Sequence, residues 1–329
     1  MNRESLLRYL ELKVHHLVQD EEWDTIHIVG EHDRTCVISA HEKTGKPFNW
    51  QRPTAASSGR KITIKCFPGN DYVYHYALII ATYLEMTGRF RGQVTYSLPT
   101  PQTCNAAFAG LDVDVSHASL VVTGWGLDHF TGIEGWSEGD GYAWKRAEVA
   151  GREVLYLGFL HSIWGDVAGR VITRLAELGA QRVVYVGKVG ALHPDITPNT
   201  CLATGNTSLV VGEKTSWQDF FEGYALGRPD IAAGLHITSP SILLEDRDWL
   251  RSQTDGLFVD PEIGPMGKAA SEAGIEFGYL HVVSNNLARE YAEDLSNERN
   301  TSVLEQRKIL LDGIRDAIAA QLHGVEGGR

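Results

Sequence analysis

Short runs of apolar residues recur along the second part of the chain, and polar or amphipathic stretches separate them. The runs are SLVVTG (119–124), REVLYLGFL (152–160), RVVYVG (182–187), TSLVVG (207–212) and YLHVVSN (279–285). Their β-branched, continuously apolar character is typical of strands that are covered on both faces of a sheet. The pattern therefore predicts an α/β core in this part of the chain.

Two segments of the same region have helical periodicity instead. In GDVAGRVITRLAELGA (165–180), Val167 and Leu175 fall on one face, and Gly179 stands where a helix would end. The segment 300–322 is a longer amphipathic helix by the same criterion. Helices that alternate with apolar strands are expected to cover the faces of a sheet.

The first part of the chain has a different rhythm. An amphipathic helix is predicted over 1–22, strands over 25–30 and 35–40, and a long loop over 41–60, which is rich in Gly, Pro, Ser and Thr. Strand, helix and strand signals of one β-α-β unit follow at 61–67, 71–88 and 92–98. We place a boundary near residue 115, so that 1–115 is an N-terminal α/β module or extension and 116–329 is the main domain.

The composition and charge of the chain indicate which kinds of binding partner to expect. The chain has 329 residues, enough for a sizeable core, and a formal net charge of −12 with no run of Lys or Arg longer than two. Nucleic acid and anionic membranes both require a basic surface, so neither is expected as a partner. A small anionic ligand is still compatible, because a site can be locally positive on an acidic protein.

Cysteine usage and the N-terminus point to a reducing compartment. Cys36, Cys66, Cys104 and Cys201 form no C-x-x-C pair, so we expect neither a zinc site nor a disulfide framework, and no metal. The first helix carries too many charges for a signal peptide, and no apolar span is long enough to cross a bilayer. We therefore expect a cytoplasmic protein.

Polar residues and glycines gather where the predicted strands end. In open α/β sheets, ligands bind at the carboxyl ends of strands, so these segments are expected to border one crevice. The glycines do not form G-x-G-x-x-G with an acidic residue at the right distance, which disfavours a dinucleotide site. The segments are 123–132, 159–169, 186–195, 256–270 and 282–286.

Two long blocks together resemble the nucleoside phosphorylase and nucleosidase superfamily. The first, 147–199, contains a strand, a helix ending in L-G, a second strand, a glycine turn (GKVG) and a shelf (PDITPN). The second, 258–287, resembles the family's ending around its V-(D/E)-M-E motif. The likeness covers about 118–320 and implies a three-layer mixed sheet flanked by helices, to which the N-terminal module is added.

The resemblance implies roles for the residues around the sugar and the base. Glu262 corresponds to the glutamate that accepts hydrogen bonds from the ribose hydroxyls, with Asp260 beside it; the alternative for Glu262 is a helix-start carboxylate. Asn285, positioned by Ser284, corresponds to the residue that contacts the base; the alternative is an amide that caps a following helix. The turn glycines Gly187 and Gly190 would form the floor, and the walls would include His161, Trp164, Ser239 and Ile242.

The same resemblance is weakest where phosphorylases hold phosphate. Tyr185 replaces an arginine, the 123–132 segment has none, and Lys188 stands where the family has Ser or Thr. Hydrolysis is therefore favoured over orthodox phosphorolysis, with Asp128 or His129 as the base that activates water. A loop histidine is also common on a plain surface, and Trp164 is as compatible with core packing as with base stacking.

The sequence thus predicts an enzyme that cleaves or exchanges the N-glycosidic bond of a nucleoside-like metabolite, as a nucleosidase or a phosphorylase-like glycosyltransferase. It would need no cofactor, with inorganic phosphate as an optional co-substrate, and the resemblance implies a homo-oligomer. Two alternatives remain. One is a non-catalytic nucleoside-binding descendant of the fold. The other is a repurposed biosynthetic enzyme, with 41–53 as a lid over the pocket.

Overall fold

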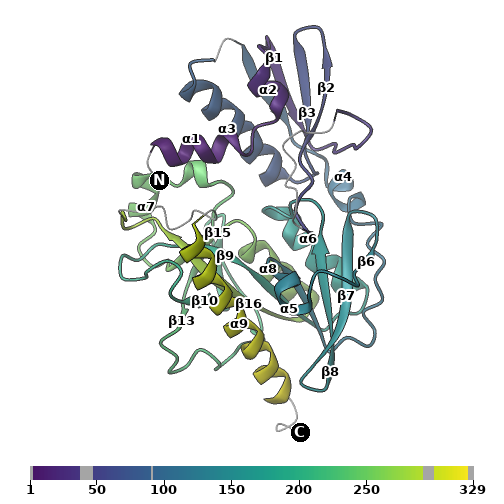
Figure 1. Cartoon of the computed structure of the whole chain (residues 1–329), viewed down its shortest axis with the longest axis vertical. Coiled ribbons are helices and arrows are strands. Elements are labelled where there is room, and N and C mark those ends of the chain that lie inside the picture. The colour runs from purple at the N-terminus through teal and green to yellow at the C-terminus, as the bar shows by residue number, and fades with distance from the viewer. Residues whose placement is uncertain (1–2, 38–46, 90–91, 292–299, 325–329) are drawn as a thin grey trace.

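The chain has two α/β parts, a smaller one at the N-terminus and a larger one that contains the C-terminus (Figure 1). A computed structural model describes residues 3–37, 47–89, 92–291 and 300–324. Figure 1 shows the N-terminal module above one end of the larger part, and the C-terminus at the opposite end.

The N-terminal module is a four-stranded sheet with helices packed on it. The strand order is β2-β3-β1-β4, and β1 runs parallel to both β3 and β4. The predicted β-α-β unit is confirmed as β3, α3 and β4. The elements are α1 (Arg3–Glu11), α2 (His16–Asp20), β1 (Thr25–Val29), β2 (Thr54–Ser58), β3 (Lys61–Lys65), α3 (Asn70–Met86), β4 (Gln93–Ser97) and α4 (Pro101–Ala106).

Two local predictions for this module were wrong, and a third is tested only in part. The helix predicted over 1–22 is divided into α1 and α2, because the His15 side chain accepts a hydrogen bond from the backbone nitrogen of Leu17 and starts a new helix there. The loop predicted over 41–60 contains β2, which pairs with β3. Of the strand predicted over 35–40, Val37 makes only an isolated bridge to Ala55, and the rest lies outside the described residues.

The larger part is built on one mixed sheet. Parallel strands β5, β8, β9 and β16 form its centre, and β7 and β15 pair antiparallel with β8 and β9. The strands are β5 (Leu120–Gly124), β6 (Ser137–Glu138), β7 (Tyr142–Val149), β8 (Arg152–Phe159), β9 (Arg182–Ala191), β10 (Leu202–Thr204), β11 (Thr207–Val210), β12 (Glu213–Ser216), β13 (Ile231–Ala233), β14 (His236–Thr238), β15 (Phe258–Asp260) and β16 (Glu276–Asn286).

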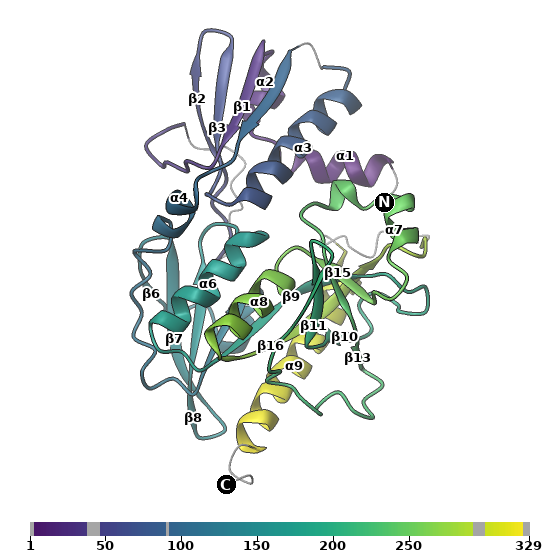
Figure 2. The same ribbon diagram turned by 180° about the vertical axis from the view of Figure 1, so that it is seen from behind.

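Helices cover both faces of this sheet and complete three layers. In Figure 1 α9 crosses the near face, and in Figure 2, seen from behind, α6 and α8 lie over the other. Core residues of α9 and α5 pack against one side of the central strands, and those of α6 and α8 against the other. The helices are α5 (Leu127–Thr131), α6 (Asp166–Glu177), a 3₁₀ turn η1 (Ile242–Leu244), α7 (Arg247–Ser252), α8 (Ile263–Ala273) and α9 (Thr301–Gly324). The predicted three-layer α/β architecture with an added N-terminal module is confirmed.

The glycine turn predicted at 187–190 is wrong, because β9 continues through it without interruption to Ala191. Both glycines are needed for close packing and not for a turn. A Cβ on Gly187 would lie 2.6 Å from His281 Nε2, and one on Gly190 would lie 2.9 Å from Leu287 Cδ1. The sheet therefore stays regular where the sequence pattern suggested that the chain reverses.

The two parts are joined where the first turns of α3 and α6 meet. The Asp166 carboxylate accepts hydrogen bonds from the backbone nitrogens of Asn70 and Asp71, and the Asp71 carboxylate accepts one from the Asp166 nitrogen. Each helix thus supplies the acceptor that the other helix N-terminus lacks. Burial, and to a lesser extent the nearby charge of Asp166, raises the pKa of the Asp71 carboxyl group to about 6.

Candidate functional site

Three strands meet at one end of the large sheet: the parallel strands β9 and β16 end there, and β15, which is antiparallel to β9, begins there. Gly190 of β9 is opposite Val259 of β15 on one side and opposite Asn285 of β16 on the other. Asp260 follows Val259 directly, and α8 begins three residues later. The two blocks that carry the family resemblance therefore meet at this sheet edge.

Asp260 is buried and holds the start of α8. Its Oδ1 accepts hydrogen bonds from the backbone nitrogens of Glu262 and Ile263, both at 2.9 Å. The same carboxylate lies 3.0 Å from His236 Nε2 and 3.5 Å from His281 Nε2. Burial acts to raise the pKa of Asp260, but His236 and His281 outweigh it and keep that pKa well below its usual range.

Glu262 stands at the N-cap of α8 without capping it, because Asp260 takes that role. Burial, and then the charge of Asp260, raises the pKa of Glu262 well above its usual value. The nearby charges that act on it include Lys13 and Asp71 of the N-terminal module. The carboxyl group therefore lies at the boundary of the two parts, and its helix-start interpretation is not supported by a capping contact.

Asn285 is the last residue but one of β16, beside a bulge at Ser284. Its Oδ1 accepts a hydrogen bond from the Ser284 hydroxyl at 3.1 Å, and its Nδ2 lies 3.5 Å from where a Cβ on Gly190 would be. No helix begins in the described residues 287–291, so the capping alternative for Asn285 is not supported there; Asn286 Oδ1 accepts a hydrogen bond from the Ala288 nitrogen within this irregular segment. The Asn285 amide is thus presented at the sheet edge.

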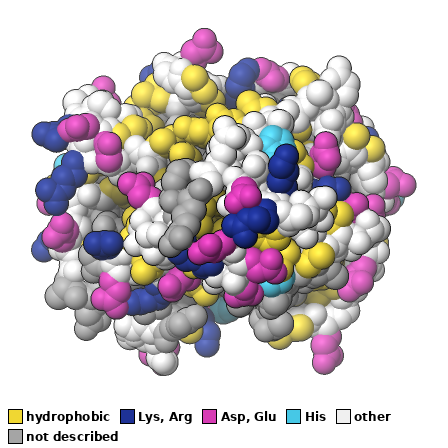
Figure 3. All heavy atoms as spheres, turned by 90° about the horizontal axis from the view of Figure 1, so that it is seen from above, with side chains coloured by type: hydrophobic (Ala, Val, Ile, Leu, Met, Phe, Trp, Pro, Cys, Tyr) yellow, Lys and Arg dark blue, Asp and Glu magenta, His cyan; other side chains and the backbone are white. Residues whose placement is uncertain are grey.

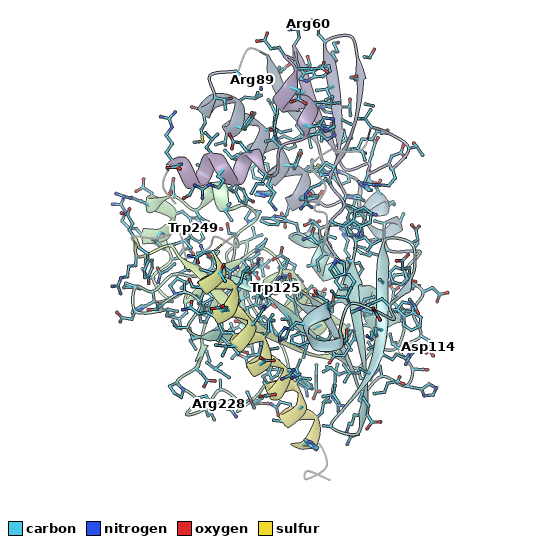
Figure 4. All side chains as sticks on the ribbon, viewed as in Figure 1. Arg60, Arg89, Asp114, Trp125, Arg228 and Trp249 are labelled. Atoms are coloured by element: carbon cyan, nitrogen blue, oxygen red, sulfur yellow. The ribbon has the colours of Figure 1, made fainter. Side chains whose placement is uncertain are left out.

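Lys188 lies on the α9 side of β9, on the opposite face from Gly187. Its ammonium is 5.1 Å from the centre of the Trp125 ring, a cation–π distance. Figure 4 shows Trp125 near the middle of the molecule, close to α9 and α5. Lys188 and Asn285 therefore approach the edge from the α9 face, and Glu262 approaches it from the α8 side.

The two candidates for a water-activating base are in α5, which follows β5. His129 Nε2 is 3.1 Å from Asp312 Oδ1 of α9, and both side chains are partly exposed. Asp128 is half-buried and has no side-chain hydrogen bond to another described residue. Because His129 contacts Asp312 of α9, Asp128 is the better candidate for the base that activates water.

The predicted wall residues lie at the boundary of the two parts. His161 stacks on Phe67 with ring centres 3.4 Å apart, and Trp164 stacks on His75 at 4.2 Å. Trp164 Nε1 donates to the Pro240 carbonyl. Ser239 is buried beside Asp260, whose carbonyl accepts from the Ser239 nitrogen, and Ile242 opens η1 on the same side.

Replacing His161 by phenylalanine is expected to protect the fold against mild acid. Burial is the main cause that lowers the pKa of His161 to about 3, so the unfolded chain binds a proton below about pH 6.5 that the folded chain does not. This destabilises the wild type as pH falls, by roughly 1 kcal/mol at pH 5.5. Phenylalanine keeps the stack on Phe67 and removes the titration. Urea unfolding of both proteins at pH 7.5 and 5.5 tests this. If the difference in their free energies of unfolding is the same at the two pH values, the prediction is wrong.

Comparisons by sequence give limited information. No protein-family model matches the chain. A curated relative is the oxidoreductase cns1 of Cordyceps militaris, which is 25% identical over 268 residues, or 69% of this chain and 33% of that protein. The chain therefore spans about a third of the length of this curated relative.

Comparisons by structure are more informative. The 5′-methylthioadenosine/S-adenosylhomocysteine nucleosidase of Campylobacter jejuni aligns with a TM-score of 0.50 and 13% identity over 63% of this chain and 99% of that one. The uridine phosphorylase of Vibrio fischeri aligns with a TM-score of 0.49 and 16% identity over 65% and 94%. The chain has the nucleoside phosphorylase and nucleosidase fold.

The alignment with this nucleosidase leaves more than a third of this chain without a counterpart in it. Several side chains of the N-terminal module lie at the boundary and were not among the sequence-predicted site residues. Lys13, Arg52 and Tyr72 lie here with the predicted Trp164, around one hollow. The sequence pattern offered no signal for them, because the resemblance begins near residue 118.

Neither a membrane span nor a metal cluster is found in the part of the chain that the structure describes. No described helix combines the length and the apolar character needed to cross a bilayer. Within the same residues, no three His, Cys, Asp or Glu side chains gather in a way that would hold a metal ion.

Proposed function

We propose that the protein cleaves the N-glycosidic bond of a nucleoside or nucleoside-like metabolite. The observation that carries this proposal is that Asp260, and not Glu262, caps the start of α8. Asp260 caps the helix, which leaves Glu262 with a carboxyl group that no capping contact uses, at the edge where Gly190 and Asn285 also lie. The fold supports this class of activity, because the solved structure that aligns with the chain at a TM-score of 0.50 is a nucleosidase.

In this proposal Glu262 accepts hydrogen bonds from two ribose hydroxyls. That contact orients the sugar and stabilises the positive charge that develops as the glycosidic bond breaks. Asn285 holds the base by donating and accepting hydrogen bonds together, which suits the edge of a 6-oxopurine. An amide cannot protonate the leaving base, so its role is orientation and not acid catalysis.

Hydrolysis is favoured over phosphorolysis within the phosphorylase-like site. Tyr185, which stands in the place of a phosphate-binding arginine, is buried against α8, and Lys188 is committed to the Trp125 ring. Asp128 is the proposed base for water, with His129 as its neighbour. The whole activity, a cytoplasmic location and self-association into a homo-oligomer are parts of this proposal.

The match to the oxidoreductase cns1 does not support a redox activity for this chain, since it covers only a third of that protein. A non-catalytic binder and a biosynthetic enzyme of the same fold remain the alternatives. The lid suggested at 41–53 is only partly described; its residues 47–53 are packed on β8, and 41–46 lie outside the described residues.

A turnover assay separates these possibilities. The purified chain is incubated with adenosine, inosine, guanosine, uridine and cytidine, with and without inorganic phosphate, and free base and sugar are separated by chromatography. We expect release of a free base, with a preference for a 6-oxopurine nucleoside. Binding by calorimetry without any release of base would favour the non-catalytic alternative, and neither binding nor release would remove the proposal.

A further inference from the structure

Arg52 is a buried cation whose guanidinium is only half satisfied. Its side chain is 6% exposed, and Nη1 donates to the carbonyl oxygens of Gln51 at 3.0 Å and Asn49 at 3.4 Å. Nε and Nη2 are also buried, and neither has a hydrogen-bond acceptor in the described structure. Leaving charged donors buried and unpaired costs several kilocalories per mole, so an unfilled acceptor position is expected beside them.

A hollow lies next to this guanidinium, at the boundary of the two parts of the chain. Its lining includes Lys13, Arg52, Tyr72 and His75 from the N-terminal module, and Ser162 and Trp164 from the segment after β8. Most of these side chains are polar or cationic. A ligand in the hollow would contact both parts at once.

The larger part of the chain fixes the position of Arg52. The backbone nitrogens of Asn49 and Gln51 donate to the carbonyls of Phe159 and Leu160, at 2.8 and 2.9 Å, so the segment follows the carboxyl end of β8. The Phe48 ring closes the contact by packing over Gly158. The guanidinium is thus held before any ligand arrives, which lowers the entropic cost of binding.

The hollow adjoins the segments that lead to Glu262. Two residues of its lining contact the loop after β14: His75 Nδ1 lies 2.7 Å from Ser241 Oγ, and Trp164 Nε1 donates to the Pro240 carbonyl at 2.9 Å. The nitrogen of the preceding residue, Ser239, donates to the carbonyl of Asp260, two residues before Glu262. A sugar held by Glu262 would therefore have a cationic hollow close to it, on the side of the N-terminal module.

The exposed Lys and Arg side chains are placed differently from the buried guanidinium of Arg52. On the face seen from above, Lys and Arg side chains are interspersed with Asp and Glu (Figure 3). Exposed cations in such a mixture attract anions weakly and are screened by salt. A buried guanidinium presents its paired donors in a fixed geometry that matches a phosphate group.

We propose that Arg52, with Lys13 beside it, forms an oxyanion site that binds a phosphate group next to the sugar held by Glu262. The phosphate belongs either to a nucleoside 5′-monophosphate or to free inorganic phosphate. This inference deepens the proposed function and rests on it for the position of the sugar.

Equilibrium binding to three probes tests the site: inorganic phosphate, inosine and inosine 5′-monophosphate. Calorimetry compares the wild type with Arg52→Met, Arg52→Lys and the control Arg60→Met, which removes an exposed arginine of the same module that pairs with Asp24. We expect Arg52→Met to weaken binding of the phosphate-bearing probe by about 10- to 100-fold, Arg52→Lys to weaken it less, and Arg60→Met to leave it unchanged.

The probes also identify the source of the phosphate. Tight binding of inorganic phosphate, together with faster release of base from inosine in its presence, assigns the site to free phosphate. Binding of inosine 5′-monophosphate at least tenfold tighter than inosine, with no binding of inorganic phosphate, assigns it to the phosphate ester. The proposal is overturned if the wild type binds neither phosphate probe, or if Arg52→Met binds them as well as the wild type does.

Wild-type measurements keep the test valid if Arg52→Met does not fold. Inorganic phosphate, compared with chloride at equal ionic strength, or inosine 5′-monophosphate, compared with inosine, is expected to raise the melting temperature. No rise with either probe overturns the inference. Failure of the proposed function would give a different result. Phosphate would still bind in a way that depends on Arg52, but no base would be released from any nucleoside or nucleotide.

Discussion

Replacing Glu262 by glutamine is expected to lower kcat/KM for nucleoside cleavage by about 100- to 1,000-fold. The carboxylate is proposed to accept hydrogen bonds from two ribose hydroxyls, and an amide can replace only one of these acceptors. The loss should appear mainly in kcat, because the contact strengthens as positive charge develops on the sugar. Steady-state assays of free base measure both constants.

The stability of the same variant provides the control. Burial and the Asp260 charge raise the pKa of Glu262 in the folded protein, so the folded chain holds this proton more tightly than the unfolded chain does. Its ionisation therefore destabilises the fold as pH rises above the unfolded value. Glu262→Gln is expected to be at least as stable as the wild type at pH 7.5. Unchanged activity in this folded variant would remove Glu262 from the proposed mechanism.

Replacing Asp260 by alanine is expected to lower the free energy of unfolding by about 3–5 kcal/mol. The buried carboxylate accepts hydrogen bonds from the nitrogens of Glu262 and Ile263, and it lies between His236 and His281. Alanine leaves the two backbone nitrogens without their acceptor and removes the charge that lies beside the two histidines. Urea unfolding followed by circular dichroism measures the loss.

Asp260→Asn is the matched variant for this prediction. It keeps one oxygen that can accept from the start of α8 and removes only the charge, so a smaller loss of about 1–3 kcal/mol is expected. The order wild type, asparagine, alanine in decreasing stability is the predicted result. If alanine were as stable as the wild type, the cap and the histidine contacts would have no role in holding α8.

The sequence predicted the large sheet well because its strands carry their own signal. The apolar runs around Val121, Leu155, Val184 and Val282 are all buried strands in the structure. Continuous apolar character depends on the local sequence alone, and so does the helical periodicity of α6 and α9. Elements of this kind can be assigned without knowing what packs against them.

Predictions that depended on long-range contacts were less successful. Gly187 and Gly190 suggested a turn, but the space beside them is filled by His281 and Leu287, which come about a hundred residues later in the sequence. Arg52 lay in a predicted loop, and its burial depends on pairing with the end of β8. The sequence also did not show the bulge at Ser284, which depends on how β16 pairs with β9.

The candidate site was predicted in part for the same reason. Glu262, Asp260 and Asn285 come from segments that match a family pattern, and the structure brings these segments to one sheet edge. His161 and Trp164 were predicted as pocket walls, but their rings stack on Phe67 and His75 of the N-terminal module. Nothing in the local sequence could show that the module packs there.

A crystal structure of the protein soaked with inosine tests the central claim most directly. The account predicts electron density for the nucleoside at the edge formed by β15, β9 and β16, with the ribose hydroxyls on the Glu262 carboxylate and the base on the Asn285 amide. Inosine bound at another place, with Glu262 and Asn285 both free of it, would contradict the account.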